Sequence, residues 1–271
     1  MSQHALGDGE FDDEMGPEDD VEMGFFEHLG ELRTRLVHAA YGIVPAAIVC
    51  FIFVEELFAW IRAPLDAAYA ARGIDGPAIH FSNLTDPFVA EIKIALVCGL
   101  LLAAPWVFYQ VWAFIAPGLY RREKLMAIPF IVMSTICFAG GAVFGYTIVF
   151  PLACDFLLGV GESIEAESVI MITDYLALTT RLLLAFGVVF EIPVIISVLT
   201  FMGITNWRAL LDFSRWWILI STLVAALLTP PDVGTQLLML IPLVGLYFLS
   251  VGIAFLIDLR QKKAESQEND E

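Results

Sequence analysis

Glu191 is the most informative single residue in the sequence, because Phe190 and Ile192 flank it within a long apolar run. A carboxylate near the middle of a membrane costs about 2.5–3.5 kcal/mol on insertion scales, so such residues usually face a cavity or a partner. We therefore expect Glu191 to face inward. Two alternatives stay open: a shallow, hydrated glutamate beside a helix break at Pro193, and a protonated, hydrogen-bonded side chain.

Two other carboxylates accompany basic residues. Glu31 precedes Arg35 by four positions in HLGELRTRL, the favourable order for a helical ion pair, which contributes about 0.2–0.5 kcal/mol. Glu123 stands within RREK, a pattern typical of a solvated loop. Taken alone, each pattern is explained by ordinary surface charge. Arg181 lies ten positions before Glu191, which is about 15 Å along a helix axis and on a different face, so these two do not pair within one helix.

The sequence contains no pattern typical of an enzyme. GxSxG, HExxH, a Walker loop and GxGxxG are all missing, and the histidines are scattered. The cysteines stand singly in or beside apolar runs, without CxxC spacing, so we expect small packing residues rather than a metal or redox site. We therefore expect no catalytic activity, no cofactor and no metal. The cysteines are Cys50, Cys98, Cys137 and Cys154.

The composition indicates a membrane protein. Of the 271 residues 59% are apolar and 17% charged, against roughly 45–50% and about 25% in soluble domains. The net charge of -17 comes from the ends of the chain: eleven of the 31 acids precede Leu32 and four follow Lys263, which leaves sixteen acids and fourteen bases between them. Nucleic-acid binding needs clustered Lys and Arg, so we expect no nucleic-acid partner.

Six stretches approach the ~20 apolar residues that cross a bilayer core of about 30 Å. They are predicted at residues 36–60, 94–112, 125–154, 175–202, 216–231 and 233–257. A short helix is predicted before the first, because residues 25, 29, 32 and 36 repeat an apolar side chain at helical spacing. The fifth stretch has sixteen uncharged residues, about 24 Å of helix, and predicts local thinning of the bilayer. Gly141 and Gly145 form a GxxxG that predicts close helix packing inside the protein, with a partner contact as the alternative.

The basic residues predict the orientation, because cytoplasmic loops carry an excess of Lys and Arg. With six spans, both termini share the side that holds ten cations, while four lie on the other side. Both termini are therefore predicted to be cytoplasmic. We expect an acidic disordered tail at 1–24 without the features of a signal peptide, a membrane domain at 25–259 and a cytoplasmic tail at 260–271. The ten cations are Arg33, Arg35, Arg121, Arg122, Lys124, Arg208, Arg215, Arg260, Lys262 and Lys263; the four are Arg62, Arg72, Lys93 and Arg181.

Seven motifs, in order from about Phe25 to Leu259, resemble TatC, the multi-span receptor subunit of the twin-arginine protein translocase. They are HLGELRTRL, Ala-Pro-Leu at 63–65, APWVFYQVWAFIAPGLYRREK at 104–124, VFPLA at 149–153, AFGVVFEIPV at 185–194, MGIT at 202–205 and LLTPPDVGTQ at 227–236. The resemblance implies an all-α membrane protein of six transmembrane helices in a glove-shaped, concave arrangement. It also implies a receptor in the cytoplasmic membrane for twin-arginine signal peptides of folded cargo.

The same resemblance implies partners and roles for individual residues. The partners are the single-span subunits TatA and TatB, recruited under the proton-motive force, and further copies of the chain in a receptor complex. A carboxylate can bind a planar guanidinium bidentately, whereas lysine offers a point charge, which would give selectivity for arginine. The resemblance assigns signal binding to Glu31, Arg33, Phe114 and Glu123, partner or signal contact within the membrane to Glu191 and Gln236, and structural or transport roles to Pro64 and Asp232.

Some alternatives to these roles stay open. Asp232 follows two prolines, so a helix cap is at least as good an explanation for it as a transport role. A proton-coupled solute transporter would also use a buried glutamate and proline-broken helices, but it would usually show internal repeats, and we find none. A passive scaffold would leave Glu31, Glu123 and Phe114 without a purpose. The resemblance does not explain Arg181 or the acidic tail.

Overall fold

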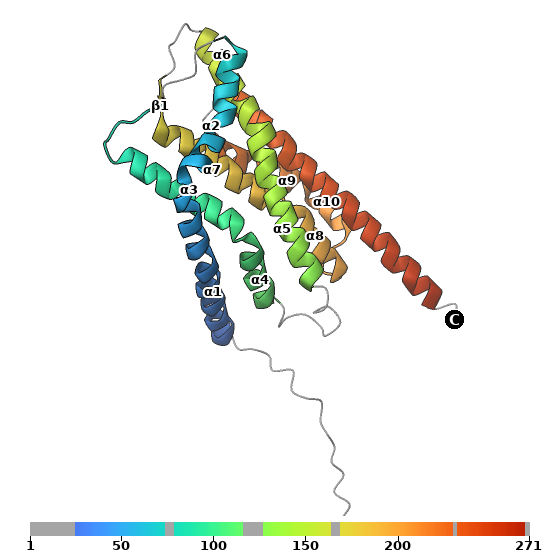
Figure 1. Cartoon of the computed structure of the whole chain (residues 1–271). Helices are drawn as coiled ribbons and strands as arrows, with labels where there is room; N and C mark the ends of the chain where they lie inside the picture. Colours follow the sequence, from blue (N-terminus) through green and yellow to red (C-terminus); the bar gives the residue numbers. More distant parts are fainter. Residues whose placement is uncertain (1–24, 74–78, 116–126, 164–168, 230–231, 269–271) are drawn as a thin grey trace, which may run out of the picture.

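The computed structural model describes residues 25–73, 79–115, 127–163, 169–229 and 232–268 (Figure 1). Within these ranges the chain is mostly helical, with two short strands and the turns that connect the elements. The elements are α1 (Phe25–Ile52), α2 (Val54–Ala71), β1 (Ile79–His80), α3 (Asp86–Leu102), α4 (Ala104–Ile115), α5 (Ala127–Phe144), the π-helical turn η3 (Gly145–Val149), α6 (Phe150–Ser163), β2 (Ile170–Met171), α7 (Ile172–Val189), α8 (Ile192–Phe201), α9 (Trp207–Leu228) and α10 (Val233–Glu268).

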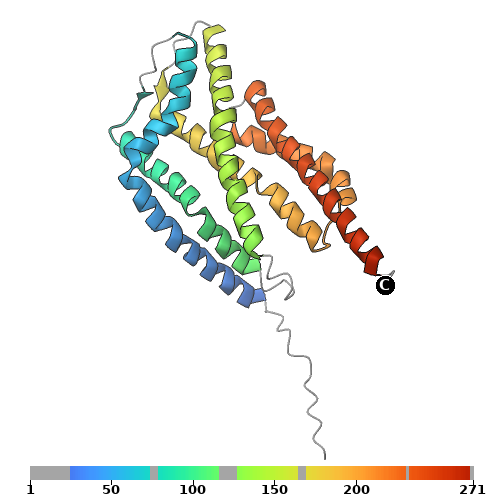
Figure 2. The ribbon, with the colours of Figure 1, turned by 45° about the vertical axis from the view of Figure 1, so that its right-hand side comes forward.

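The described helices form five segments long and apolar enough to cross a membrane, or six when the bent pair α3 and α4 counts as one span. This agrees with the predicted all-α membrane fold. In Figure 1, α1 begins and α10 ends toward one end of the molecule, while α2 and α6 lie at the other. Figure 2 shows the helices fanning out from the α2 and α6 end, with α1, α3 and α4 on one side and α9 and α10 on the other.

The first predicted span is wrong at both ends. A single continuous helix, α1, runs from Phe25 to Ile52, so no separate short helix precedes it. Phe53 leaves helical geometry and its N–H bonds the carbonyl of Cys50 at 3.2 Å. A new helix, α2, then begins with two glutamates in its first turn, where acidic side chains are favourable. The prediction missed this break because it extended the span through Glu55 and Glu56 to the apolar residues that follow them, and hydropathy alone does not register a turn.

Three other spans are interrupted beside prolines. The bend of 59° between α3 and α4 falls at Ala103, two residues before Pro105. The helix of the fourth span breaks at Phe190–Glu191, shortly before Pro193. The π-helical turn η3 precedes Pro151 in the third span. Proline lacks a backbone N–H and clashes with the carbonyl four residues earlier, which explains why these breaks accompany it.

The predicted fifth span was too short. Helix α9 begins at Trp207 and has 22 residues, which is about 33 Å at 1.5 Å per residue. The Asn206 side chain caps it by accepting a hydrogen bond from the N–H of Ala209 at 2.9 Å. The prediction counted only the uncharged residues after Arg215, so it missed two exposed helical turns. The predicted local thinning of the bilayer at this helix stays a prediction.

Helix α10 continues through Glu268, beyond residue 259. Strands β1 and β2 pair in parallel, with Ile79 beside Ile170 and His80 beside Met171. This pairing joins the segment before α3 to the segment before α7. The sequence did not predict it, because a strand of two residues has no readable periodicity.

Close packing of small residues joins the central helices. A Cβ added at Gly141 would clash with the backbone carbonyl of Phe186, and one at Gly145 would press on the Phe186 ring. The GxxxG prediction of packing inside the protein is confirmed: Gly141 of α5 and Gly145 of η3 both pack against α7. In the same way, a Cβ on Gly99 of α3 would lie 2.6 Å from the backbone of Ala47 in α1. The four cysteines are free thiols.

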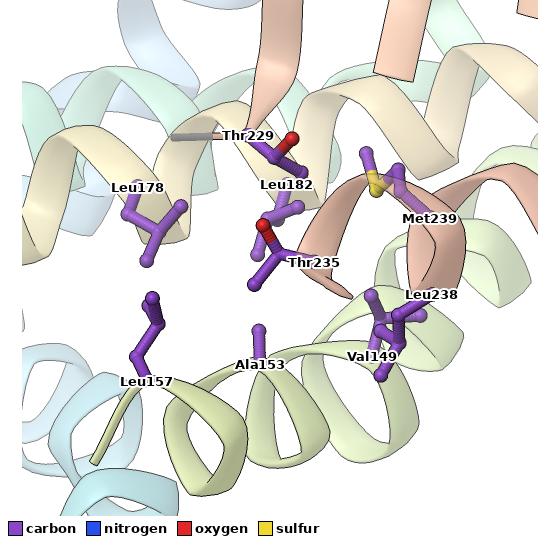
Figure 3. Close-up of a pocket in the computed structure, with 9 residues that line it drawn as sticks. All are labelled: Val149, Ala153, Leu157, Leu178, Leu182, Thr229, Thr235, Leu238 and Met239. Carbon is purple, nitrogen blue, oxygen red and sulfur yellow. The ribbon is translucent and has the colours of Figure 1, made fainter. Parts of the chain in front are cut away.

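The end of the molecule that holds α6 and the start of α10 is tightly closed. Figure 3 shows side chains of α6, α7 and α10 converging there, with Thr229 and Thr235 among otherwise apolar groups. The cavity they leave is about 10 Å³, about the smallest volume that can hold one water molecule. The side chains of these elements therefore pack closely against one another at this end of the molecule.

Candidate functional site

Helix α4 is fixed on α1 by a tryptophan. The indole ring of Trp106 lies against Gly42, where any added Cβ would overlap the ring. The Nε1–H of Trp106 donates a hydrogen bond to the carbonyl of His38 at 2.8 Å. Because both contacts come from one rigid side chain, they set the distance between the two helices and the register of α4 along α1.

This register brings Phe114 of α4 onto the first turns of α1. The Phe114 ring stacks on the His28 ring with centroids 4.4 Å apart and an interplanar angle of 21°. Glu31 follows His28 by three residues, so it lies on the same face of α1, one turn further along. Glu31 therefore lies one helical turn along α1 from the stack of His28 on Phe114. Arg33 is exposed and lies about 200° around the helix from Glu31, on the opposite face, so it is not part of this cluster.

Glu31 forms the ion pair that the sequence predicted. Its Oε1 accepts a hydrogen bond from Nη2 of Arg35 at 3.3 Å, and 19% of the Glu31 side chain is exposed. The other oxygen, Oε2, is shielded from solvent and has no hydrogen-bond partner among the described residues; the same holds for Nε of Arg35. The contact is single and long rather than a bidentate fork. The carboxylate therefore keeps capacity to accept a hydrogen bond from another cation. Glu123 lies outside the described residues.

A second polar group lies deeper in the molecule. Glu191 occupies the break between α7 and α8 and is 8% exposed, so the predicted inward orientation is confirmed. Its carboxyl group hydrogen-bonds with the hydroxyl of Ser134 on α5. Its Oε1 is buried without a partner among the described residues. The helix breaks near Pro193, as expected, and the Glu191 side chain at this break is buried inside the protein.

Glu191 lines a cavity of about 330 Å³ between α4, α5 and α8. Its other walls are almost entirely apolar, with Ser134 as the second polar side chain. Helix α4 contributes to both sites, because Phe114 stacks on α1 while its neighbour Ile115 lines the cavity. The remaining lining residues are Phe108, Val111, Trp112, Val194, Ile195, Val198, Leu199, Met202 and Ile204.

Gln236 and Asp232 lie apart from both sites, near the start of α10. The Nε2 of Gln236 donates to the carbonyl of Thr222 at 3.3 Å and so joins α10 to α9. Asp232 caps α10, because its Oδ1 accepts from the N–H of Thr235 at 2.7 Å and its Oδ2 accepts from the Thr235 hydroxyl. The predicted capping role of Asp232 is confirmed.

Pro64 lies inside α2, where it leaves the carbonyl of Trp60, four residues earlier, without its helical donor. The hydroxyl of Tyr146, in η3, donates to this carbonyl. The adjacent carbonyl, that of Ile61, accepts from the buried hydroxyl of Tyr175 at 2.5 Å. Neither tyrosine was predicted from the sequence. A proline in an otherwise helical segment was the available signal, since it marks a carbonyl that needs another donor.

Comparison with known proteins gives the family. The model of the Sec-independent protein translocase protein (TatC) family matches residues 27–242. The chain belongs to the TatC family. TatC of Koribacter versatilis is 38% identical over 256 residues, which is 92% of each chain. TatC of Aquifex aeolicus is 35% identical and the match covers 90% of this chain and 99% of that one.

A solved structure agrees with this assignment. The crystal structure of a twin-arginine translocase receptor TatC is 35% identical, covers 86% of this chain and all of that one, and superposes with a TM-score of 0.76. Membership in TatC makes this chain a multi-pass membrane protein of a protein-translocation family rather than an enzyme. The solute transporter and the passive scaffold are therefore set aside as descriptions of this TatC family member.

Proposed function

We propose that this protein is the receptor of a twin-arginine translocation system and binds the signal peptides of folded proteins at the cluster of Glu31 and Phe114. The observation that carries this proposal is the partly shielded Glu31 carboxylate, with one oxygen unpaired among the described residues, one turn from the His28–Phe114 stack. Glu123 is proposed as a second carboxylate and Arg33 as a flanking contact. The similar protein of known crystal structure is a twin-arginine translocase receptor, which supports the assignment.

The physical basis of the proposal is the shape of the guanidinium group. An arginine of the signal presents a planar fork of donors to Glu31, whereas a lysine presents one point charge. Arg35 already holds Oε1, but at 3.3 Å and partly exposed to solvent, and such pairs contribute only about 0–1 kcal/mol. An incoming arginine can therefore replace Arg35 or add to it at low cost. A hydrogen bond to a charged group contributes about 1.5–3 kcal/mol.

The proposed location is the cytoplasmic membrane, with both termini in the cytoplasm. The positive-inside rule supports this orientation, because ten of the fourteen basic residues fall on the side of the termini. The beginning of α1 and the end of α10 also lie toward one end of the molecule, as an even number of spans requires (Figure 1). The Glu31 cluster is on that side, where a signal peptide arrives before export.

We assign the Glu191 cavity to contact with a partner's transmembrane helix or with an inserted signal. Its apolar walls suit a helix, and the unpaired Oε1 of Glu191 offers one polar anchor. Gln236 is proposed as a further partner contact, and Pro64 and Asp232 as structural supports. The proposed partners are the single-span subunits TatA and TatB, and further copies of the chain, assembled for export driven by the proton-motive force.

The test measures binding of two synthetic leaders, one with paired arginines and one with paired lysines, to the purified full-length protein. We expect the arginine leader to bind at least tenfold more tightly. Glu31→Gln should weaken its binding about tenfold, the equivalent of one charge-assisted hydrogen bond. Glu56→Gln, an exposed glutamate in the first turn of α2, is the matched control and should bind like the native protein. Equal affinity for the two leaders would contradict the proposal.

A further inference from the structure

Arg181 is a permanently charged residue within the span formed by α7 and α8. It lies nine residues after Ile172, where this 30-residue span begins, which is about 14 Å along the helix. The side chain is exposed on the surface of the molecule, and no described residue forms an ion pair with it. A charged side chain at this depth is costly unless it finds an opposite charge.

The exposed face of α7 forms a continuous stripe around Arg181. Asp174, Arg181 and Val188 are all exposed and follow one another at intervals of seven residues. Seven residues turn a helix through almost two full turns, so each of the three side chains is rotated only about 20° around the helix axis from the one before it. The opposite face of α7 packs on α5, where Phe186 contacts Gly141 and Gly187 contacts Phe138. None of the described helices covers the stripe, which therefore faces the membrane or a partner.

The stripe leads to the Glu191 cavity. Seven residues beyond Val188 lies Ile195, which is also exposed and lines that cavity. Ile195 lies 14 residues beyond Arg181, about 21 Å along the 30-residue span that α7 and α8 form together. The turn at Phe190–Glu191 separates α7 from α8, so the cavity follows the stripe along the same span without continuing its helical spacing.

We propose that the stripe of Asp174, Arg181 and Val188 is the docking surface for a partner's transmembrane helix that carries a carboxylate opposite Arg181. This inference rests on the proposed function in one respect: it takes the Glu191 cavity as a place where a partner helix binds. Charge complementarity selects an acidic partner, because a guanidinium in an apolar setting gains most from a carboxylate that it can bind with two parallel hydrogen bonds.

Depth favours a helix over a lipid headgroup as the source of the negative charge. Long basic side chains reach the interface from positions near the ends of a span. Arg181 lies seven residues, about 10 Å, further into the span than the exposed Asp174. A carboxylate on a neighbouring helix can lie at the same depth in the membrane as the Arg181 guanidinium. A lipid phosphate lies at the membrane surface, so the Arg181 side chain would have to extend along the helix to reach it.

The experiment uses the full-length protein in phosphatidylcholine vesicles, with a photo-crosslinking residue, p-benzoylphenylalanine, at Val188. The probe is a 20-residue Leu-Ala transmembrane peptide with one glutamate at the depth of Arg181, compared with the same peptide carrying glutamine. We expect the glutamate peptide to crosslink at least fivefold more. Arg181→Leu should abolish this preference and Arg181→Lys should keep part of it. Arg181→Glu should reverse it in favour of a peptide carrying lysine.

Lys93→Leu, which removes an exposed basic residue of α3, is the matched control and should leave the preference unchanged. Equal crosslinking of the glutamate and glutamine peptides would overturn the inference and leave lipid phosphate as the partner of Arg181. Binding of the arginine leader, measured on the same preparations, monitors folding of each variant. It also separates the two proposals. Equal binding of the arginine and lysine leaders by the native protein would contradict the proposed role of the Glu31 cluster and would not bear on the stripe.

Discussion

Removing the hydroxyl of Tyr146 tests whether this residue supplies the donor that Pro64 removes from α2. In the native protein the Trp60 carbonyl accepts from Tyr146, because residue 64 has no N–H to offer. Tyr146→Phe leaves that carbonyl without a partner, which costs about 1–3 kcal/mol. In a Pro64→Ala background the new N–H of residue 64 can satisfy the same carbonyl. The tyrosine hydroxyl should then contribute less than about 0.5 kcal/mol.

The assay is a double-mutant cycle of unfolding free energy for the purified protein in detergent, comparing native, Tyr146→Phe, Pro64→Ala and the double variant. We expect a coupling of about 1 kcal/mol or more between positions 64 and 146, because neighbouring groups that share one hydrogen bond are not additive. Tyr41→Phe, which alters an exposed tyrosine of α1, should cost less than about 0.5 kcal/mol in either background. If Tyr146→Phe costs the same in the native and the Pro64→Ala backgrounds, the explanation of the proline is refuted.

Three further substitutions test the sites and the packing. Glu123→Lys should abolish photo-crosslinking of a twin-arginine signal while the protein still inserts into the membrane, and unchanged crosslinking would reject a role for Glu123. Glu191→Leu should reduce export of a folded reporter in cells while purified protein still distinguishes arginine from lysine leaders; full export would contradict the assignment of the cavity. Gly141→Ala should lower the free energy of unfolding by about 1–3 kcal/mol through overpacking against Phe186, whereas Gly140→Ala, which has open space beside it, should change it by less than about 0.5 kcal/mol.

The sequence predicted the helical membrane fold well because hydropathy reports burial in lipid over whole spans. It failed where a short-range backbone feature ends a helix inside an apolar run. The break at Phe53 is the example. It also failed at the start of α9, because a helix capped by Asn206 can carry Arg208 and Arg215 on its exposed face before the uncharged residues begin. In both places the pattern of apolar residues gave the wrong boundary.

The candidate site was predicted in part. The inward orientation of Glu191 followed from the cost of a carboxylate in an apolar run, and the Glu31–Arg35 pair followed from their spacing. The stack of His28 on Phe114 could not be predicted, because it depends on how Trp106 lies across Gly42. Contacts between residues far apart in sequence depend on tertiary packing, which one sequence does not encode in any local pattern.

Helix α4 is short, joins α3 at a sharp bend and presents different sides to two neighbours: Phe114 to α1 and Ile115 to the space around Glu191. Both side chains belong to one short helix that joins α3 at Ala103. A rotation of α4 about this bend would therefore change the positions of Phe114 and Ile115 together. A bound peptide that displaces α4 through Phe114 would also move Ile115, and with it one wall of the cavity around Glu191.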